Sequence, residues 1–231
     1  TTQTLTSNPF TGIGVSGFGL NGVFITNAKD VLRVNNNTFS QTYYPVTANY
    51  TVAPNAAMIM SVAQNTITAT GVGVIKEGVT VSSALSFTPT TDNMRVTVNT
   101  FSNVEIGVKT VSVKSGLRIS NNNIYLNLSA GNSKRYGVYL AGNNNKVIVD
   151  NNYIFGSNTN ANPANYGFNN VGIFCETSPT CNIQCNTIEK TGHGVEYRGG
   201  NASPGAGLLK NTFIYPMKRG LVLSNGGLVG M

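Results

Sequence analysis

Apolar and polar positions recur in a fixed order along this chain. An apolar residue is followed by two free positions, an Asn, one free position and a second apolar residue, as in Val149-Asp150-Asn151-Asn152-Tyr153-Ile154. The Asn of the pattern recurs at Asn37, Asn65, Asn99, Asn122, Asn152, Asn186 and Asn211. Repeats at intervals of about 20–50 residues are typical of architectures in which each repeat stacks on the next.

The chemistry of Asn suggests how one repeat is built. Both apolar neighbours can point inward if the Asn lies at a sharp bend between two short strands. Asn tolerates the left-handed backbone conformation that such a bend needs, and its amide can bond nearby backbone groups. Stacked bends would bring the amides into contact, so the pattern predicts an asparagine ladder.

A second repeat consists of a Gly followed by apolar residues one and three positions later. It occurs at Gly22, Gly71, Gly137, Gly172, Gly194 and Gly220. Alternation of this kind predicts a half-buried strand, which we expect the chain to enter through a glycine turn. One repeat then reads as glycine turn, strand, turn, strand, Asn bend and strand.

These two repeats resemble the right-handed parallel β-helix proteins of the pectate-lyase-like superfamily. The resemblance implies an all-β chain, a right-handed parallel β-helix of about seven coils with an asparagine ladder, over residues 18–231 as one domain. Residues 1–17 are expected to be a lead-in or edge segment. The chain stops at Gly230-Met231, part-way through a coil, and β-helices need capped ends, so we interpret it as a fragment of a longer protein.

Phrases such as Cys185-Asn186-Thr187-Ile188 and Gly220-Leu221-Val222-Leu223-Ser224-Asn225 also resemble large secreted or surface proteins of Bacteroidota. Those proteins are exported by the type IX secretion system. The resemblance implies an extracellular or cell-surface location, with the type IX export machinery as a partner.

Composition narrows the classes of partner. Charged residues make up only 10% of the chain, whereas about 25% is usual. The net charge of +7 favours anionic partners, but the basic residues are scattered, as at Lys109, Lys134 and Lys218. No nucleic-acid motif and no apolar run of membrane-spanning length occurs, so we expect neither nucleic-acid binding nor membrane insertion.

The three cysteines lie close together in the sequence, at Cys175, Cys181 and Cys185. A disulfide between Cys175 and Cys181 would close a proline-containing turn in an exported protein, and the alternative is a buried pair of free thiols. No set of residues with zinc-ligand spacing accompanies them, and we expect no metal and no other cofactor.

Four segments interrupt the repeats and are expected to be loops: residues 40–57, 82–94, 156–170 and 199–207. Loops of this kind often carry binding sites. Five aromatic residues lie in or beside them, namely Tyr43, Tyr44, Tyr50, Tyr166 and Phe168. Such side chains can stack on sugar rings or cover the core.

Catalytic chemistry has little support in the sequence. Thr191-Gly192-His193-Gly194 is similar to a Gly-His-Gly stretch of polygalacturonases, but the acidic motifs of those enzymes are missing, so His193 is interpreted as a turn residue. Glycoside hydrolysis needs two carboxylates that flank the sugar bond. The acidic set expected to lie on neighbouring coils is Glu176, Glu189 and Glu196, which we interpret as solvent-facing.

The sequence therefore predicts a non-catalytic, secreted or cell-surface β-helix segment that acts as a stalk or adhesin passenger and binds glycans through its loops. We assign no catalytic or metal-ligating residue. The alternative is a polysaccharide lyase or glycoside hydrolase of the pectate-lyase-like superfamily, in which Glu176, Glu189 and Glu196 do the chemistry.

Overall fold

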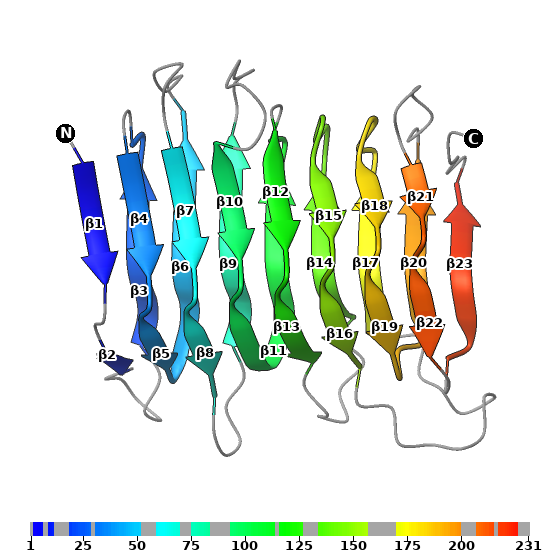
Figure 1. Ribbon diagram of the computed structural model, residues 1–231, viewed down its shortest axis with the longest axis horizontal. Helices are drawn as coiled ribbons and strands as arrows, with labels where there is room; N and C mark the ends of the chain where they lie inside the picture. Colours follow the sequence, from blue (N-terminus) through cyan, green and yellow to red (C-terminus); the bar gives the residue numbers. More distant parts are fainter. Residues whose placement is uncertain are drawn as a thin grey trace.

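Strands are the only regular elements in the described part of the chain. The computed structural model describes residues 2–6, 9–11, 19–28, 31–51, 59–69, 75–83, 93–113, 116–126, 134–156, 170–199, 207–214 and 217–225. Neighbouring strands along the molecule come from successive sequence repeats, and their pairings are parallel (Figure 1).

The first sheet contains one short strand from each repeat, in chain order along the long axis (Figure 1). Its strands are β1 (Thr2–Thr6), β4 (Val31–Asn35), β7 (Ile59–Ala63), β10 (Met94–Thr97), β12 (Leu117–Ser120), β15 (Ile148–Asp150), β18 (Asn182–Gln184) and β21 (Gly207–Leu209).

The second sheet has two arms that meet at β11 (Thr100–Val111). The short arm contains β2 (Pro9–Thr11), β5 (Thr38–Ser40), β8 (Thr66–Thr68), β13 (Asn123–Leu126), β16 (Tyr153–Phe155), β19 (Thr187–Glu189) and β22 (Thr212–Ile214). The long arm contains β3 (Gly19–Thr26), β6 (Thr42–Tyr50), β9 (Ile75–Ser83), β14 (Arg135–Ala141), β17 (Asn170–Glu176), β20 (His193–Arg198) and β23 (Arg219–Ser224). The first residues of β11 belong to the short arm and its last residues to the long arm.

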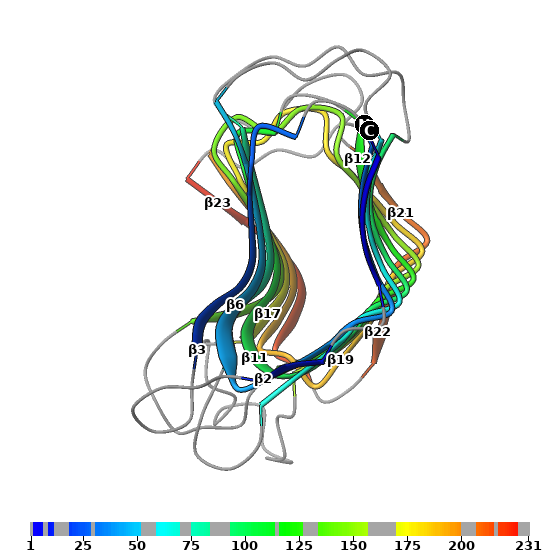
Figure 2. The same ribbon diagram turned by 90° about the vertical axis from the view of Figure 1, so that its left-hand side faces the viewer.

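Viewed along the long axis, the first sheet and the two arms surround an elongated interior in a nearly closed cross-section (Figure 2). The all-parallel pairing and this arrangement are compatible with a parallel β-helix. Buried aliphatic side chains fill the interior, including Val62, Val96, Ile119 and Val149. Burial of each such side chain stabilises the fold by about 1.5–3 kcal/mol.

The sequence repeat sets the register between strands. The apolar residue three positions before each ladder Asn pairs with its counterpart in the next repeat, as Val34 does with Val62 and Ile119 with Val149. The apolar residue two positions after the Asn does the same, as Ile124 does with Ile154. Both apolar positions of the pattern therefore form continuous columns inside the molecule.

The ladder asparagines form one row of hydrogen bonds. Asn122 accepts bonds at its side-chain oxygen from the backbone nitrogen and the Nδ2 atom of Asn99, both at 3.0 Å. Its own Nδ2 donates to the oxygen of Asn152 at 2.9 Å and to the carbonyl of Val96 at 3.0 Å. The same side-chain bonds link Asn37 to Asn65, Asn65 to Asn99, Asn152 to Asn186 and Asn186 to Asn211.

The bend beside the ladder differs from the prediction in one respect. The left-handed conformation lies on the residue before each ladder Asn: at Asn36, Gln64, Val98, Asn121, Asn151, Cys185 and Lys210, with φ between 51° and 58°. The ladder residue is thus freed from the turn conformation, and its side chain points inward. This conformation is least favourable at Val98, because a β-branched residue disfavours positive φ.

The repeated glycines also have a different role from the predicted one. Gly137, Gly172 and Gly194 lie inside strands and not in turns. A Cβ atom on Gly137 would lie 2.5 Å from the Cγ2 atom of Ile154 and 2.6 Å from the carbonyl oxygen of Gly172. Each glycine therefore allows two successive repeats and the inward Ile or Phe to approach closely.

The glycine column includes two positions that were not predicted from the sequence, although Gly78-Val79-Thr80-Val81 fits the same pattern. Gly78 and Gly107 have equally close neighbours, whereas the predicted Gly71 lies outside the described residues. Close approach of the backbone is the common requirement in this column. Apolar residues after the glycine are not required at every position of the column, since Thr110 occupies the third position after Gly107.

The structure adds strands to two of the predicted segments. Within the expected loop 40–57, residues 42–50 form β6, which pairs with β3 over residues 42–49 and with β9 over residues 46–50. Within residues 1–17, β1 and β2 pair with β4 and β5, in register with the next repeat. The expected loops at 82–94, 156–170 and 199–207 fall mostly outside the described residues.

Within the described ranges, no helix is long and apolar enough to cross a membrane.

Candidate functional site

Two groups of polar and aromatic side chains lie on the long and short arms, away from the aliphatic interior. The first, here called the glutamate network, contains Tyr139, Glu176, His193, Glu196 and Arg198. On β20, Glu196 and Arg198 alternate with the core residues Val195 and Tyr197, so they lie on the opposite face of the strand. The ring of His193 joins them through its contact with Glu196.

Direct contacts hold the glutamate network together. The carboxylate of Glu196 lies 3.0 Å from Nδ1 of His193 and accepts a longer bond of 3.4 Å from Arg198. Glu176, on the neighbouring strand, accepts a bond of 2.8 Å from the hydroxyl of Tyr139. Because Glu176 pairs in register with Arg198, the two carboxylates lie on adjacent strands beside the same guanidinium group.

Aromatic rings line one side of the network. Phe174 lies 5.2 Å from both Tyr136 and Tyr139 between ring centroids, and the guanidinium of Arg198 lies 5.1 Å from the Phe174 centroid. A guanidinium over a ring is an attractive arrangement. Burial, together with the bond to Glu176, raises the pKa of the Tyr139 hydroxyl, so this tyrosine stays neutral and keeps donating.

Part of the network is buried, whereas Tyr139, Glu176 and Arg198 are partly exposed. Phe174, His193 and Glu196 are 2%, 7% and 3% exposed, although Phe174 and Glu196 face away from the aliphatic core. Buried ionisable groups at such positions are often functional, but structural ion-pair networks produce the same pattern. Here each carboxylate already has a partner within the protein.

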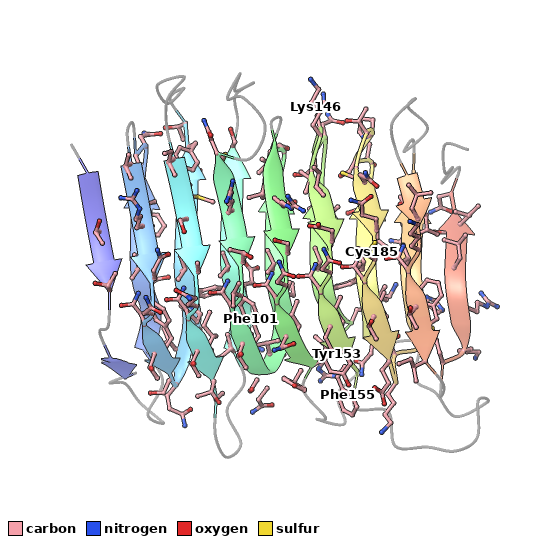
Figure 3. All side chains as sticks on the ribbon, viewed as in Figure 1. Phe101, Lys146, Tyr153, Phe155 and Cys185 are labelled. Atoms are coloured by element: carbon pink, nitrogen blue, oxygen red, sulfur yellow. The ribbon has the colours of Figure 1, made fainter. Side chains whose placement is uncertain are left out.

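The second group, here called the aromatic strip, contains Tyr125, Tyr153, Phe155, Glu189 and Lys190. Tyr153 and Phe155 belong to β16 (Figure 3), and Phe155 pairs in register with Tyr125 on one side and Glu189 on the other. Ring centroids of the three aromatic residues are 6.1–6.5 Å apart. Tyr125 is 38% exposed, so part of the strip is open to solvent.

Polar groups flank the aromatic strip. Glu189 accepts a bond of 2.8 Å from the hydroxyl of Tyr153, and the ammonium of Lys190 lies 3.6 Å from the Glu189 carboxylate. The same ammonium lies 4.9 Å from the centroid of the Phe155 ring. Partial desolvation and the hydrogen bond to Glu189 raise the pKa of Tyr153 to about 12.

The predicted acidic set is therefore divided. Glu176 and Glu196 lie in the glutamate network, and Glu189 lies in the aromatic strip. None is an isolated solvent-facing group, because each has a hydrogen-bond partner. His193 is the first residue of β20 and is buried, so its interpretation as a turn residue is wrong.

Of the two possibilities considered for Cys175 and Cys181, the structure has the pair of buried thiols and not the disulfide. Cys175 and Cys181 are buried thiols that are not joined in a disulfide, and Cys185 is an exposed thiol. The two buried thiols are in hydrogen-bonding contact, which, with burial, raises the pKa of Cys175 well above its usual range. Both face the aliphatic core and are part of it.

The aromatic residues expected in loops have other positions. Tyr43 and Tyr44 are half-buried on β6, and Tyr50 is fully buried in the core. Tyr166 and Phe168 lie outside the described residues. The aromatic residues of the strip were not identified from the sequence, because their proximity depends on the register between repeats.

Acidic and sulfur ligands do not gather into a metal site within the described ranges, where no group of three or more His, Cys, Asp or Glu residues could hold an ion. Asp150 is 1% exposed and accepts two hydrogen bonds from Arg118, of 2.5 and 3.0 Å. This carboxylate has a structural partner between neighbouring strands.

Comparison with known proteins gives no further assignment: no family model, no curated protein and no solved structure matches the chain.

Proposed function

We propose that this chain is a segment of a right-handed parallel β-helix that acts outside the cell as a non-catalytic stalk or adhesin passenger. The observation that carries the proposal is how the acidic side chains are engaged. Glu176, Glu189 and Glu196 each bind a tyrosine, histidine or basic side chain of the protein itself. A general acid or nucleophile for sugar cleavage has to face the substrate bond.

The fold supports the same proposal. The stacked strands, the ladder and the glycine column produce an elongated body whose interior is filled with aliphatic groups. Right-handedness is part of the proposal and follows from the strong preference of parallel strand crossovers for that hand. The low content of charged residues and the resemblance to type IX-exported proteins of Bacteroidota support an extracellular location and that export route.

A second candidate function is cleavage of an acidic polysaccharide. The buried contact between His193 and Glu196, next to Arg198 and Glu176, is the observation that favours it. If a substrate displaced the present partners, two carboxylates and a histidine would become available on one face of the long arm.

Turnover assays distinguish the two functions. The purified chain is incubated with polygalacturonate or alginate in the presence of calcium, and reducing ends and the absorbance of unsaturated uronate are measured. The stalk function predicts no product above the background of a protein-free sample. The matched variants are Glu196→Gln in the network and Glu105→Gln, which affects only a surface pair with Lys76.

Cleavage that disappears in Glu196→Gln and persists in Glu105→Gln would replace the stalk proposal by the enzyme. Binding to a glycan array without turnover supports the adhesin function.

A further inference from the structure

The outer face of the short arm continues beyond the aromatic strip along the molecule. In the strands β5, β8, β13, β16 and β19 and at the start of β11, the residues on either side of the buried Phe or Ile face outward. β22 continues the arm, but its central Phe213 is 37% exposed. One outward column runs Ser40, Thr68, Ser102, Tyr125, Phe155, Glu189 and Ile214, with each member in register with the next. We call the surface of this arm the short-arm face.

The type of side chain on the short-arm face changes along the column from one repeat to the next. Hydroxyl groups occupy the first three positions, aromatic rings the next two, and the ion pair of Glu189 and Lys190 follows. Neighbouring parallel strands lie about 4.8 Å apart, which is close to the length of one sugar unit in an extended polysaccharide. The face therefore offers one group per sugar unit along a line parallel to the long axis.

The charge on this face selects among possible occupants. Glu189 is the only charged residue within the described strands of the short arm and residues 100–102 of β11. The ammonium of Lys190 offsets it at 3.6 Å, so the face is close to neutral on a chain of net charge +7. An anionic polymer would gain little here, and it would meet the Glu189 carboxylate beside the rings.

Neutral sugars match the groups that are present. A pyranose ring carries an apolar C–H face that packs on an aromatic ring, and hydroxyl groups around its edge that donate and accept hydrogen bonds. Tyr125 and Phe155 provide ring surface, while Glu189 can accept from, and Lys190 can donate to, sugar hydroxyls. Thr and Ser hydroxyls continue the polar contacts along the column.

We infer that the short-arm face is a binding site for an extended neutral glycan, centred on Tyr125 and Phe155. The inference rests on the proposed adhesin function and deepens it, because it assigns the ligand class and moves the site from loops to strands. The glycan lies along the long axis of the molecule and crosses β13, β16 and β19 in succession.

The test uses the full chain and neutral hexasaccharides of the β-1,4-glucan, mannan, xylan and chitin types. Polygalacturonate and alginate oligosaccharides are the anionic comparison, and binding is measured by isothermal titration calorimetry. The test variant is Tyr125→Thr combined with Phe155→Thr, which places at both positions a residue already present in the same column at Thr68. The control is Phe24→Thr, which removes an aromatic ring that is 61% exposed on β3.

The expected result is that at least one neutral hexasaccharide binds with a Kd of about 1 mM or tighter. The double variant weakens this affinity about tenfold or more, as loss of central aromatic contacts commonly does. Phe24→Thr leaves the affinity unchanged, and circular dichroism melting shows that all variants are folded.

Three results would overturn the inference: no neutral hexasaccharide binds, binding is unaffected in the double variant, or only uronate oligosaccharides bind and Lys190→Ala abolishes that binding. Failure of the stalk proposal looks different. In that case the protein cleaves a polysaccharide in a manner that depends on Glu196, whether or not the short-arm face binds sugar.

Discussion

Replacement of Asn122 by Ala removes the middle of the asparagine ladder. The side chain accepts two hydrogen bonds from Asn99 and donates one each to Val96 and Asn152. Each bond contributes about 1 kcal/mol net, so the expected loss is about 4 kcal/mol in the free energy of unfolding. One of these four bonds comes from the buried backbone N–H of Asn99, which the substitution leaves without this acceptor, so we do not expect a smaller loss.

The loss of stability on Asn→Ala substitution should also depend on the position of the Asn in the ladder. Asn211 accepts the same two bonds from Asn186 but is only partly buried, whereas Asn122 is 0% exposed. Water can replace the lost partners near Asn211, so Asn211→Ala should cost about 1–2 kcal/mol. Asn123→Ala, next to the ladder but exposed, serves as the control and should change stability by less than about 0.5 kcal/mol.

The assay is guanidinium unfolding followed by circular dichroism of the β-sheet signal, with the slope of the transition compared between variants. A domain has a total stability of about 5–15 kcal/mol, so a loss of 4 kcal/mol shifts the midpoint strongly. If Asn122→Ala unfolds within 1 kcal/mol of the unmodified protein and with the same slope, the ladder is not a main source of stability and this reasoning is wrong.

Three other substitutions test the rest of the fold by the same unfolding measurement. Gly137→Ala should destabilise by about 2–3 kcal/mol or more, because the new methyl group meets backbone at 2.6 Å. Val98→Asn should stabilise by about 1 kcal/mol, since Asn tolerates the φ of 57° that Val disfavours. Tyr197→Phe should stabilise by about 1 kcal/mol at neutral pH, because its buried hydroxyl has no hydrogen-bond partner in the described part of the chain. Burial raises the pKa of Tyr197, so the native state keeps the proton above pH 10 while the unfolded chain loses it, and the decline in stability above pH 10 should be shallower in Tyr197→Phe.

Two of these predictions have controls, one at a glycine in the first sheet and one at the same turn position in another repeat. Gly207→Ala places its methyl group 3.1 Å from a side-chain oxygen of Asn182 and should cost less than Gly137→Ala. Lys210→Asn occupies the same turn position as Val98 but starts from an unbranched residue, so its gain should be smaller. An equal effect within either pair would contradict the explanation by contact or by backbone strain.

Much of the fold follows from the sequence because its determinants are local. Six residues around each ladder Asn specify the register of two columns, and the structure pairs those columns repeat by repeat. The sequence contains a further match to the pattern, with Phe18, Asn21 and Val23 in its three fixed positions, only 16 residues before Asn37. In the structure Asn21 lies on β3 and pairs with Tyr44 of β6, not with a ladder residue. The glycine repeat was recognised in the sequence, but its role could not be predicted, because the close approach involves atoms of the neighbouring repeat.

The side-chain groups on the outer faces were harder to predict, since they depend on the lengths of turns between repeats. Glu176 and Arg198 become neighbours only when β17 and β20 are aligned, and Tyr125 and Phe155 only when β13 and β16 are aligned. Glu189 is close in sequence to Glu196 but belongs to another arm. The three glutamates were assigned to one acidic set because the repeat alignment placed them on neighbouring coils, and that alignment did not separate the two arms.

The ladder also gives the molecule a direction. Every side-chain oxygen in the row receives its bonds from the repeat that precedes it, from Asn65 through Asn211. The amide groups thus add their small electric moments along one axis, as aligned peptide groups do in a helix. From Asn65 through Asn211, each side-chain oxygen faces the preceding repeat, and the Nδ2 atoms that donate to these oxygens face the following one, so the two directions along the molecule are chemically different.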